Sequence, residues 1–168
     1  GKDVVVRSKT GSGKTFAFAL PIISNLSPEK KLQALILCPT RELAVQIDAE
    51  IIKLSKIVKT VLIYGGVAIG PQMQKLDDGA QLAIATPGRL LDHLERGSLD
   101  LSHVHFVVLD EADRMLDMGF IDDVERILSA APKDKQMMLF SATMPDQIVR
   151  LSDRYMKSPE TLLLQQDE

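Results

Sequence analysis

Cysteine is nearly missing from this sequence of 168 residues, which contains only Cys38. A single thiol excludes an internal disulfide and a metal site built from cysteines, so we predict that Cys38 packs as a small core residue. The three histidines, His93, His103 and His105, have no partners at metal-ligand spacing and are interpreted as surface or structural residues.

Long apolar runs and a leader sequence are also missing. No stretch of about 18 apolar residues occurs, so no segment is predicted to span a membrane. The first six residues, Gly1 to Val6, lack the basic and apolar regions of a signal peptide. They also lack an initiator methionine, and we therefore expect the sequence to begin partway through a longer protein. An intracellular location, cytoplasmic or nuclear, is expected.

An excess of positive charge is missing too. The chain has 20 lysines and arginines against 23 acidic residues, a formal net charge of −3 and a pI near 5.6. Proteins that hold nucleic acid by bulk electrostatics are basic, so this chain could bind nucleic acid only through a few placed contacts. The apolar fraction of 45% and the charged fraction of 26% are ordinary for a globular protein. The length fits one domain that is large enough to bury a core.

Short apolar runs alternate with helical patterns along the chain. In the segment Glu42 to Val58 apolar residues recur every three or four positions, and a second stripe extends from Ile121 to Leu128, so both are predicted to be helices with one face on the core. This alternation predicts an α/β domain with one central, largely parallel sheet of seven strands, covered on both faces by helices. The predicted strands are Val4–Arg7, Ala34–Cys38, Val61–Tyr64, Leu82–Ala85, Phe106–Leu109, Met137–Phe140 and Thr161–Leu164.

A phosphate-binding loop is predicted where the first strand ends, because residues 8–15 read S-K-T-G-S-G-K-T. Gly11 and Gly13 allow backbone N–H groups to curl around phosphates. Lys14 can reach the β- and γ-phosphates, and Thr15 can bind Mg²⁺ at the N-terminus of the next helix. The pattern G-x-x-x-x-G-K-[ST] is missed only at its first position, where Ser8 replaces glycine. A glycine-rich turn without function is the alternative, which the position between a strand and a helix disfavours.

Two adjacent carboxylates follow another apolar strand. The run that ends at Leu109 is followed by D-E-A-D, residues 110–113. Hydrolysis of a nucleoside triphosphate needs one carboxylate to hold the Mg²⁺ shell and a second to orient the attacking water. We assign these tasks to Asp110 and Glu111, with a simple helix-capping role for Asp110 as the alternative. Together with the phosphate loop, this pair predicts an NTP-dependent enzyme domain.

The chain resembles the DEAD-box RNA helicases of superfamily 2 over essentially its whole length. Residues 8–15 are similar to motif I of that family and residues 110–113 to motif II. Each of the remaining matches would be weak alone, but together they stand in the family order. These matches are Pro39-Thr40-Arg41-Glu42-Leu43 (motif Ia), Gly65-Gly66 (the GG doublet), Thr86-Pro87-Gly88-Arg89 (motif Ib), Arg114 to Phe120, and Ser141-Ala142-Thr143 (motif III).

The resemblance implies a role for each matching position. Lys14, Asp110 and Glu111 would be catalytic, with Thr15 and Asp110 at the Mg²⁺ ion. Hydroxyls, exposed backbone N–H groups and two arginines would grip the sugar–phosphate backbone of RNA without reading bases. The residues implied to bind ATP are Ser8, Lys9, Thr10, Gly11, Ser12, Gly13, Lys14 and Thr15. Those implied to line the RNA track are Pro39, Thr40, Arg41, Gly66, Thr86, Gly88 and Arg89, and those implied to couple the two sites are Asp113, Ser141 and Thr143.

The two arginines have an alternative interpretation. Taken without the family resemblance, Arg41 and Arg89 would be read as ordinary surface charges or as partners in local salt bridges.

The resemblance also implies that residues 1–168 hold half of an active site. They correspond to the first of two RecA-like domains of a P-loop NTPase, without the upstream glutamine motif that reads adenine. The second domain supplies arginines that are worth about 10³–10⁵ in rate in related NTPases, so this monomeric fragment is expected to be nearly inactive alone. Two alternatives stay open: a nucleotide-gated RNA clamp or scaffold with little unwinding, and a DNA-directed helicase of superfamily 2. The D-E-A-D, P-T-R-E-L and S-A-T motifs argue against the second.

Overall fold

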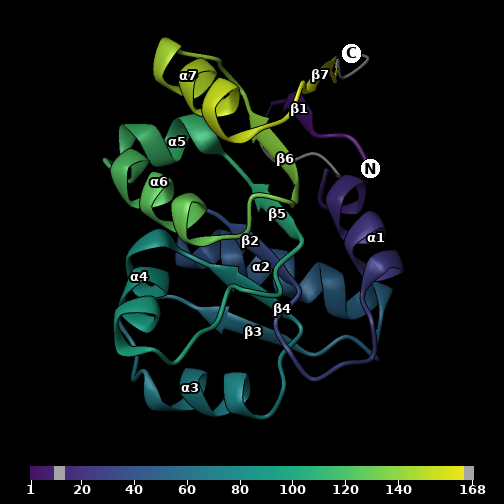
Figure 1. Ribbon diagram of the computed structural model, residues 1–168, viewed down its shortest axis with the longest axis vertical. Helices are drawn as coiled ribbons and strands as arrows, with labels where there is room; N and C mark the ends of the chain where they lie inside the picture. Colours follow the sequence, from purple (N-terminus) through teal and green to yellow (C-terminus); the bar gives the residue numbers. More distant parts are fainter. Residues whose placement is uncertain (10–13, 165–168) are drawn as a thin grey trace.

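The computed structural model describes residues 1–9 and 14–164. Seven strands form one sheet in the order β3-β4-β2-β5-β6-β1-β7 (Figure 1). All the described strand pairs are parallel, which confirms the predicted α/β architecture. Each strand begins and ends within one residue of its predicted bounds. The strands are β1 (Val4–Arg7), β2 (Ala34–Leu37), β3 (Thr60–Ile63), β4 (Leu82–Ala85), β5 (Phe106–Leu109), β6 (Gln136–Ser141) and β7 (Glu160–Leu163).

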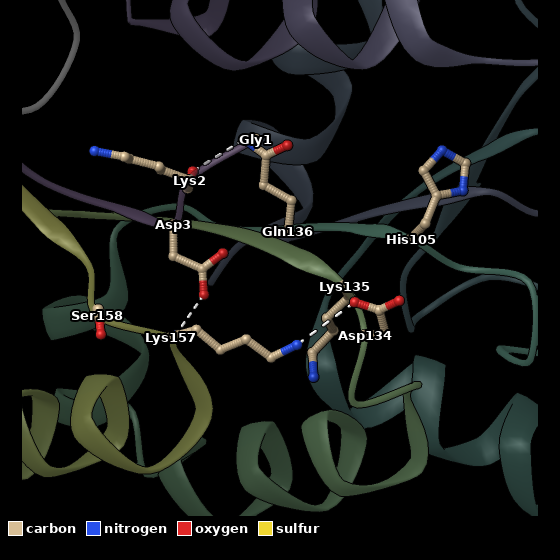
Figure 2. Close-up of a pocket in the computed structure, with 9 residues that line it drawn as sticks. All are labelled: Gly1, Lys2, Asp3, His105, Asp134, Lys135, Gln136, Lys157 and Ser158. Atoms are coloured by element: carbon tan, nitrogen blue, oxygen red, sulfur yellow. Dashed lines mark hydrogen bonds and ion pairs between the residues drawn. The ribbon is translucent and has the colours of Figure 1, made fainter.

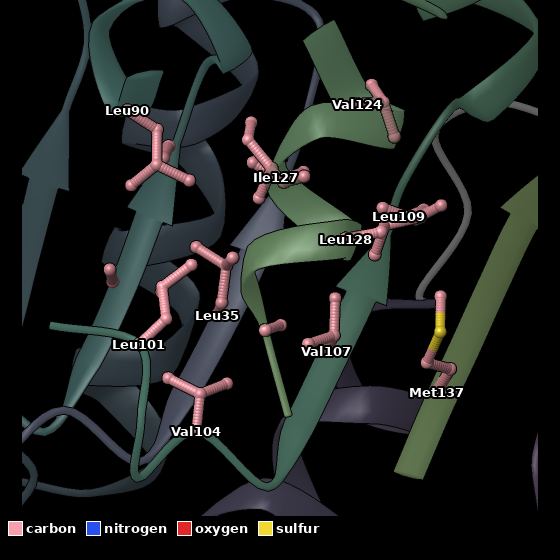
Figure 3. Close-up of a cluster of buried hydrophobic side chains, with 14 of the residues drawn as sticks. Leu35, Leu90, Leu101, Val104, Val107, Leu109, Val124, Ile127, Leu128 and Met137 are labelled. Carbon is pink, nitrogen blue, oxygen red and sulfur yellow. The ribbon is translucent and has the colours of Figure 1, made fainter. Parts of the chain in front are cut away.

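Helices cover both faces of the sheet. Successive residues of a strand point to opposite sides, and because the central strands are apolar throughout, both sides must be covered. Ile36 of β2 packs in the core cluster that receives Phe18 from α1 and Ile47 from α2. Its neighbour Leu35 packs in the other cluster, which the remaining helices cover (Figure 3). The helices are α1 (Thr15–Asn25), α2 (Arg41–Leu54), α3 (Gly70–Asp77), α4 (Pro87–Arg96), α5 (Ala112–Asp117), α6 (Ile121–Ala130) and α7 (Asp146–Tyr155).

The prediction that the second helix continues to Val58 is wrong, because α2 ends at Leu54. Ser55 leaves the helix with extended backbone, and its Oγ accepts a hydrogen bond from Ile57 N at 3.3 Å. Serine hydroxyls compete in this way with the helical hydrogen bonds of the backbone. Val58 still packs against the core from outside the helix, which explains why the apolar periodicity continues beyond the helix end.

Coverage of the strands on both faces holds in the middle of the sheet and fails at β7. Every residue of β2, β4 and β5 is buried. All four residues of β7 are exposed, and β7 is an edge strand that pairs only with β1 among the described strands. Cys38 is fully buried, as predicted. Within residues 1–9 and 14–164, no helix combines the length and apolarity that a membrane crossing requires.

Candidate functional site

The parallel sheet brings the predicted site residues to one edge, since the carboxyl ends of parallel strands all lie there. Strands β5, β6 and β1 are neighbours and lead into the segments predicted to bind nucleotide. Strands β3, β4 and β2 form the other half of the sheet and lead into the segments predicted to bind RNA. The residues at these strand ends are Asp110 (β5), Ser141 (β6), Ser8 (β1), Gly66 (β3), Thr86 (β4) and Thr40 (β2).

A buried ion pair lies in the nucleotide half. Lys14 Nζ is 2.9 Å from Asp110 Oδ1, and the two side chains are 7% and 1% exposed. Lys14 and Asp110, to which the family resemblance assigns catalytic roles, therefore lie together. Burial raises the pKa of the Asp110 carboxyl, and the Lys14 ammonium offsets only part of this effect. Apart from the ion pair, Asp110 Oδ1 has no hydrogen-bond partner among the residues that the structure describes.

The donors around this pair fit Mg²⁺ bound to a nucleotide. Thr15, the first residue of α1, is 9% exposed, and its hydroxyl is a second potential ligand besides the Asp110 carboxylate. Mg²⁺ commonly takes one or two carboxylates and fills its other positions with water and phosphate oxygens. The described residues contain no group of three or more His, Cys, Asp or Glu placed to bind a metal.

The rest of the predicted phosphate loop is described only at its start. Ser8 is buried, its N donates to Ser141 O at 3.1 Å, and its hydroxyl is without a hydrogen-bond partner in the described part of the chain. Lys9 is exposed. Four residues assigned to phosphate binding lie outside the described residues: Thr10, Gly11, Ser12 and Gly13.

Glu111 has a backbone conformation that is rare for residues other than glycine. Its φ of 53° and ψ of 52° place it in the left-handed region, which recurs at functional sites. The side chain is largely buried, and Arg114 Nη1 donates to its Oε2 at 3.4 Å. Glu111 occupies the N-cap position of α5 but makes no capping bond with its side chain. The alternative that Asp110 serves as the helix cap is therefore wrong.

A hydrogen-bonded cluster joins the end of β6 to α5. Asp113 N donates to Ser141 Oγ at 3.1 Å, and Ser141 Oγ donates to Thr143 O at 2.6 Å. Asp113 Oδ2 accepts from Thr143 N at 3.1 Å and from Thr143 Oγ1 at 2.9 Å. Burial works against ionisation, but these hydrogen bonds outweigh it and hold the pKa of Asp113 below its ordinary value. The three residues predicted to couple the sites therefore contact one another.

In the RNA half, motif Ia offers one exposed cation. The Arg41 guanidinium is exposed and lies over the Tyr64 ring, 4.9 Å from its centroid. Thr40 Oγ1 accepts from Leu43 N at 3.2 Å and so caps α2, while its hydroxyl proton stays available as a donor. Pro39 is buried and can contribute backbone and shape only.

The GG doublet and motif Ib add small groups to the same edge. Gly66 is exposed at φ 79°, where a side chain would be strained. Thr86 precedes α4 without using its side chain as a cap, and Gly88 is exposed in the first turn of that helix. These groups suit contact with a phosphate backbone.

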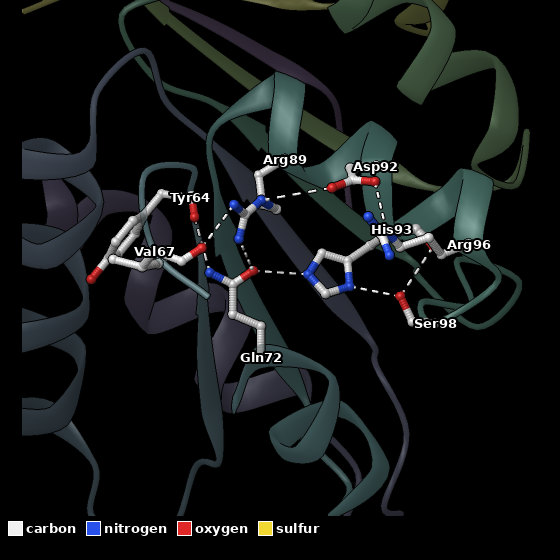
Figure 4. A network of polar contacts seen from close by, with 8 residues as sticks. All are labelled: Tyr64, Val67, Gln72, Arg89, Asp92, His93, Arg96 and Ser98. Atoms are coloured by element: carbon white, nitrogen blue, oxygen red, sulfur yellow. Dashed lines mark hydrogen bonds and ion pairs between the residues drawn. The ribbon is translucent and has the colours of Figure 1, made fainter. Parts of the chain in front are cut away.

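Arg89 is less exposed than the RNA prediction implies, since only 14% of its side chain is accessible. Its Nη2 donates to Val67 O at 2.9 Å and its Nη1 donates to Gln72 Oε1 at 3.3 Å (Figure 4). Sequence reasoning missed Gln72 and the buried His93 that contacts it at 2.8 Å. The spacing of Arg89 and His93 by four residues, which places them on one helix face, was the available signal.

A pocket of about 510 Å³ lies at the opposite, amino-terminal edge of the sheet and contains none of the predicted site residues (Figure 2). Asp3 is buried there and accepts from Met137 N at 2.9 Å and from Lys157 N at 2.7 Å. These bonds tie the start of β1 to β6 and to the segment before β7, which indicates a structural role.

Comparison with known proteins identifies relatives along the whole chain. The DEAD/DEAH box helicase family matches residues 1–151. "ATP-dependent RNA helicase CshA" of Listeria monocytogenes is 49% identical across 100% of this chain and 33% of its own length. "ATP-dependent RNA helicase DeaD" of Escherichia coli is 52% identical across 98% of this chain and 27% of its own length. The chain thus spans about a third of the length of these curated relatives.

The solved structures include a close match to the fold. The crystal structure of a DEAD box protein from the hyperthermophile Methanococcus jannaschii superposes with a TM-score of 0.94 at 47% identity. The match covers 98% of this chain and 46% of that one.

Proposed function

Because the chain belongs to the DEAD/DEAH box helicase family, we propose that it is the domain through which an ATP-dependent RNA helicase binds ATP and RNA. Residues 1–168 would be the first of two RecA-like domains of that enzyme. The buried Lys14–Asp110 pair beside Glu111 carries the proposal, because a cation and two carboxylates lie together at one end of the sheet.

The nucleotide half supplies positioning and charge. Lys14 would leave Asp110 and bind the β- and γ-phosphates, while Asp110 and Thr15 would hold Mg²⁺. Bound Mg²⁺ neutralises charge on the phosphate oxygens. Glu111, held in place by its backbone and by Arg114, would orient the attacking water and accept its proton.

The RNA half supplies contacts that do not depend on base identity. Thr40, Arg41, Gly66, Thr86 and Gly88 present hydroxyl, guanidinium and backbone N–H groups, which suit sugar–phosphate oxygens. Arg89 would contribute the small part of its guanidinium that is accessible.

The contacts between α5 and β6 would respond to the state of the bound nucleotide. The Asp113–Ser141–Thr143 cluster directly follows the Asp110-Glu111 pair, so a change at the γ-phosphate would reach it through one turn of α5.

RNA is proposed over DNA because the relatives carry RNA helicase names.

ATPase assays on the full-length protein test the proposal. We expect hydrolysis stimulated by single-stranded RNA and not by DNA of the same length, little turnover by residues 1–168 alone, and loss of turnover with retained ATP binding in Glu111→Gln. Calorimetry should show that Lys14→Ala loses ATP binding. Robust RNA-stimulated turnover by residues 1–168 would contradict the half-site account, and unchanged ATP affinity in Lys14→Ala would contradict the site itself.

A further inference from the structure

We propose that Gln72 and His93 are positioning residues for RNA binding, which hold the Arg89 guanidinium at the RNA track and tie the GG turn to helix α4. The inference rests on the proposed function, because it concerns how Arg89 is presented to RNA.

Gln72 is the centre of this arrangement (Figure 4). It is 6% exposed, lies on α3 and donates from Nε2 to Tyr64 O, just after β3, at 3.0 Å. Its Oε1 accepts from Arg89 Nη1 at 3.3 Å and lies 2.8 Å from His93 Nε2. Arg89 Nη2 also donates to Val67 O, in the turn after the GG doublet. One amide therefore connects the end of β3, α3 and two successive turns of α4.

The hydrogen-bond directions around Gln72 follow from the Tyr64 carbonyl, which can act only as an acceptor. Because the Tyr64 carbonyl can only accept, the Gln72 NH₂ must face it and Oε1 must face Arg89 and His93. His93 Nε2 must then carry a proton and donate to Oε1. His93 Nδ1 can accept from Ser98 Oγ, 2.7 Å away, so the neutral imidazole satisfies the network.

His93 makes the network rigid. Its side chain is fully buried, and burial together with the nearby Arg89 charge lowers its pKa, so the ring stays neutral at pH 7. A buried ring with both nitrogens bonded cannot rotate freely, and it fixes the Gln72 amide in turn. An arginine side chain loses considerable rotamer freedom when it is immobilised. Arg89 is already fixed before RNA arrives, so less of that loss falls on binding.

Paired substitutions separate positioning from simple packing. RNA affinity is measured by fluorescence anisotropy of a labelled oligouridylate with the full-length protein, Mg²⁺ and a non-hydrolysable ATP analogue. We expect Gln72→Leu and His93→Leu to weaken RNA binding about fivefold to tenfold, from the loss of hydrogen bonds that hold a charged group. His93→Gln, whose amide can still donate to Gln72 Oε1, should retain most of the affinity. Gln74→Leu is the matched control, because the Gln74 side chain is exposed on the same helix and bonds only to Asp78 at 3.0 Å among the described residues.

The mechanism also predicts that the effects are not additive. If Gln72 acts through Arg89, then Gln72→Leu should add nothing to the loss caused by Arg89→Gln. Both variants should also reduce the slope of log affinity against log salt by about 0.7, the value for one phosphate contact on a single strand.

Several results would overturn the inference while leaving the proposed function intact. These are additive losses in the double variant, a normal salt slope in Gln72→Leu, equal losses in His93→Gln and His93→Leu, or a loss in Gln74→Leu as large as that in Gln72→Leu. If Gln72→Leu does not give a cooperative melting transition, the two His93 variants decide. Failure of the unmodified protein to bind the RNA would instead refute the proposed function.

Discussion

Removal of the Lys14 ammonium should convert Asp110 from a paired group into an isolated buried charge. The Asp110 side chain is 1% exposed, and Lys14 Nζ is its close cationic partner at 2.9 Å. Lys14→Ala should therefore destabilise the protein even in the absence of nucleotide, because a buried carboxylate without a partner is poorly solvated.

The size of this loss is limited by protonation. Truncating one member of a buried ion pair costs about 3–5 kcal/mol. Asp110 can escape by taking up a proton, which costs about 4 kcal/mol at pH 7 and about 1.5 kcal/mol at pH 5 for a carboxyl of ordinary pKa. Where a carboxyl has a higher pKa in the folded protein than in the unfolded chain, the free energy of unfolding falls as the pH rises through the folded value. The loss in Lys14→Ala should thus be up to about 4 kcal/mol at pH 7 and up to about 1.5 kcal/mol at pH 5.

Urea denaturation at both pH values measures these losses. The substitution is made in the native chain and in Asp110→Asn, which has no charge left to strand. We expect Lys14→Ala to cost little in the Asp110→Asn background. The reasoning would be refuted by an equal loss at pH 5 and pH 7, or by an equal loss in both backgrounds.

Three further changes test other parts of the structure. Asp113→Asn should lower the free energy of unfolding by about 1 kcal/mol at pH 7, as expected for partly exposed hydrogen bonds to Thr143. Because the pKa of Asp113 is depressed, the greater stability of the native protein should persist above the ordinary pKa of aspartate and disappear in urea titrations at lower pH. A difference that does not depend on pH would argue against this account. Gly66→Ala should lower the free energy of unfolding by about 1 kcal/mol because of the positive φ, with no steric clash since the space around an added Cβ is open. It should also weaken RNA binding in an anisotropy assay, and unchanged RNA affinity would count against the GG turn as an RNA contact. Phe140→Ala should lower the free energy of unfolding in chemical denaturation by about 3–5 kcal/mol, because its ring is fully buried and packs edge-on against Phe18, with 5.4 Å between the ring centroids. Phe16→Ala, at an exposed position, should be nearly neutral, and similar losses in the two variants would contradict the packing argument.

Local patterns were sufficient for the strands and for the positions of two helices, and they indicated a chemistry for individual segments. Apolar runs located all seven strands within one residue. In the middle of the sheet the reason is that a strand covered on both faces is apolar throughout. The glycine loop and the acidic pair were recognisable because the chemistry needs particular residue types at adjacent positions. The end of α2 was not, because the Ser55 side chain competes with the helix while the apolar period continues to Val58.

Tertiary structure alone decided how these segments meet. The strand order, which no local period encodes, separates the segments proposed to bind nucleotide, after β5, β6 and β1, from those proposed to bind RNA, after β3, β4 and β2. It also brings Lys14 to Asp110. The left-handed backbone of Glu111 is likewise a feature of the folded chain. The Gln72–His93 contact joins α3 to α4 through a side-chain amide. One glutamine and one histidine, far apart in the sequence, give no local pattern that predicts such a bond. Its contribution to stability depends on burial and on the direction of each donor, and both are set only once the helices have packed.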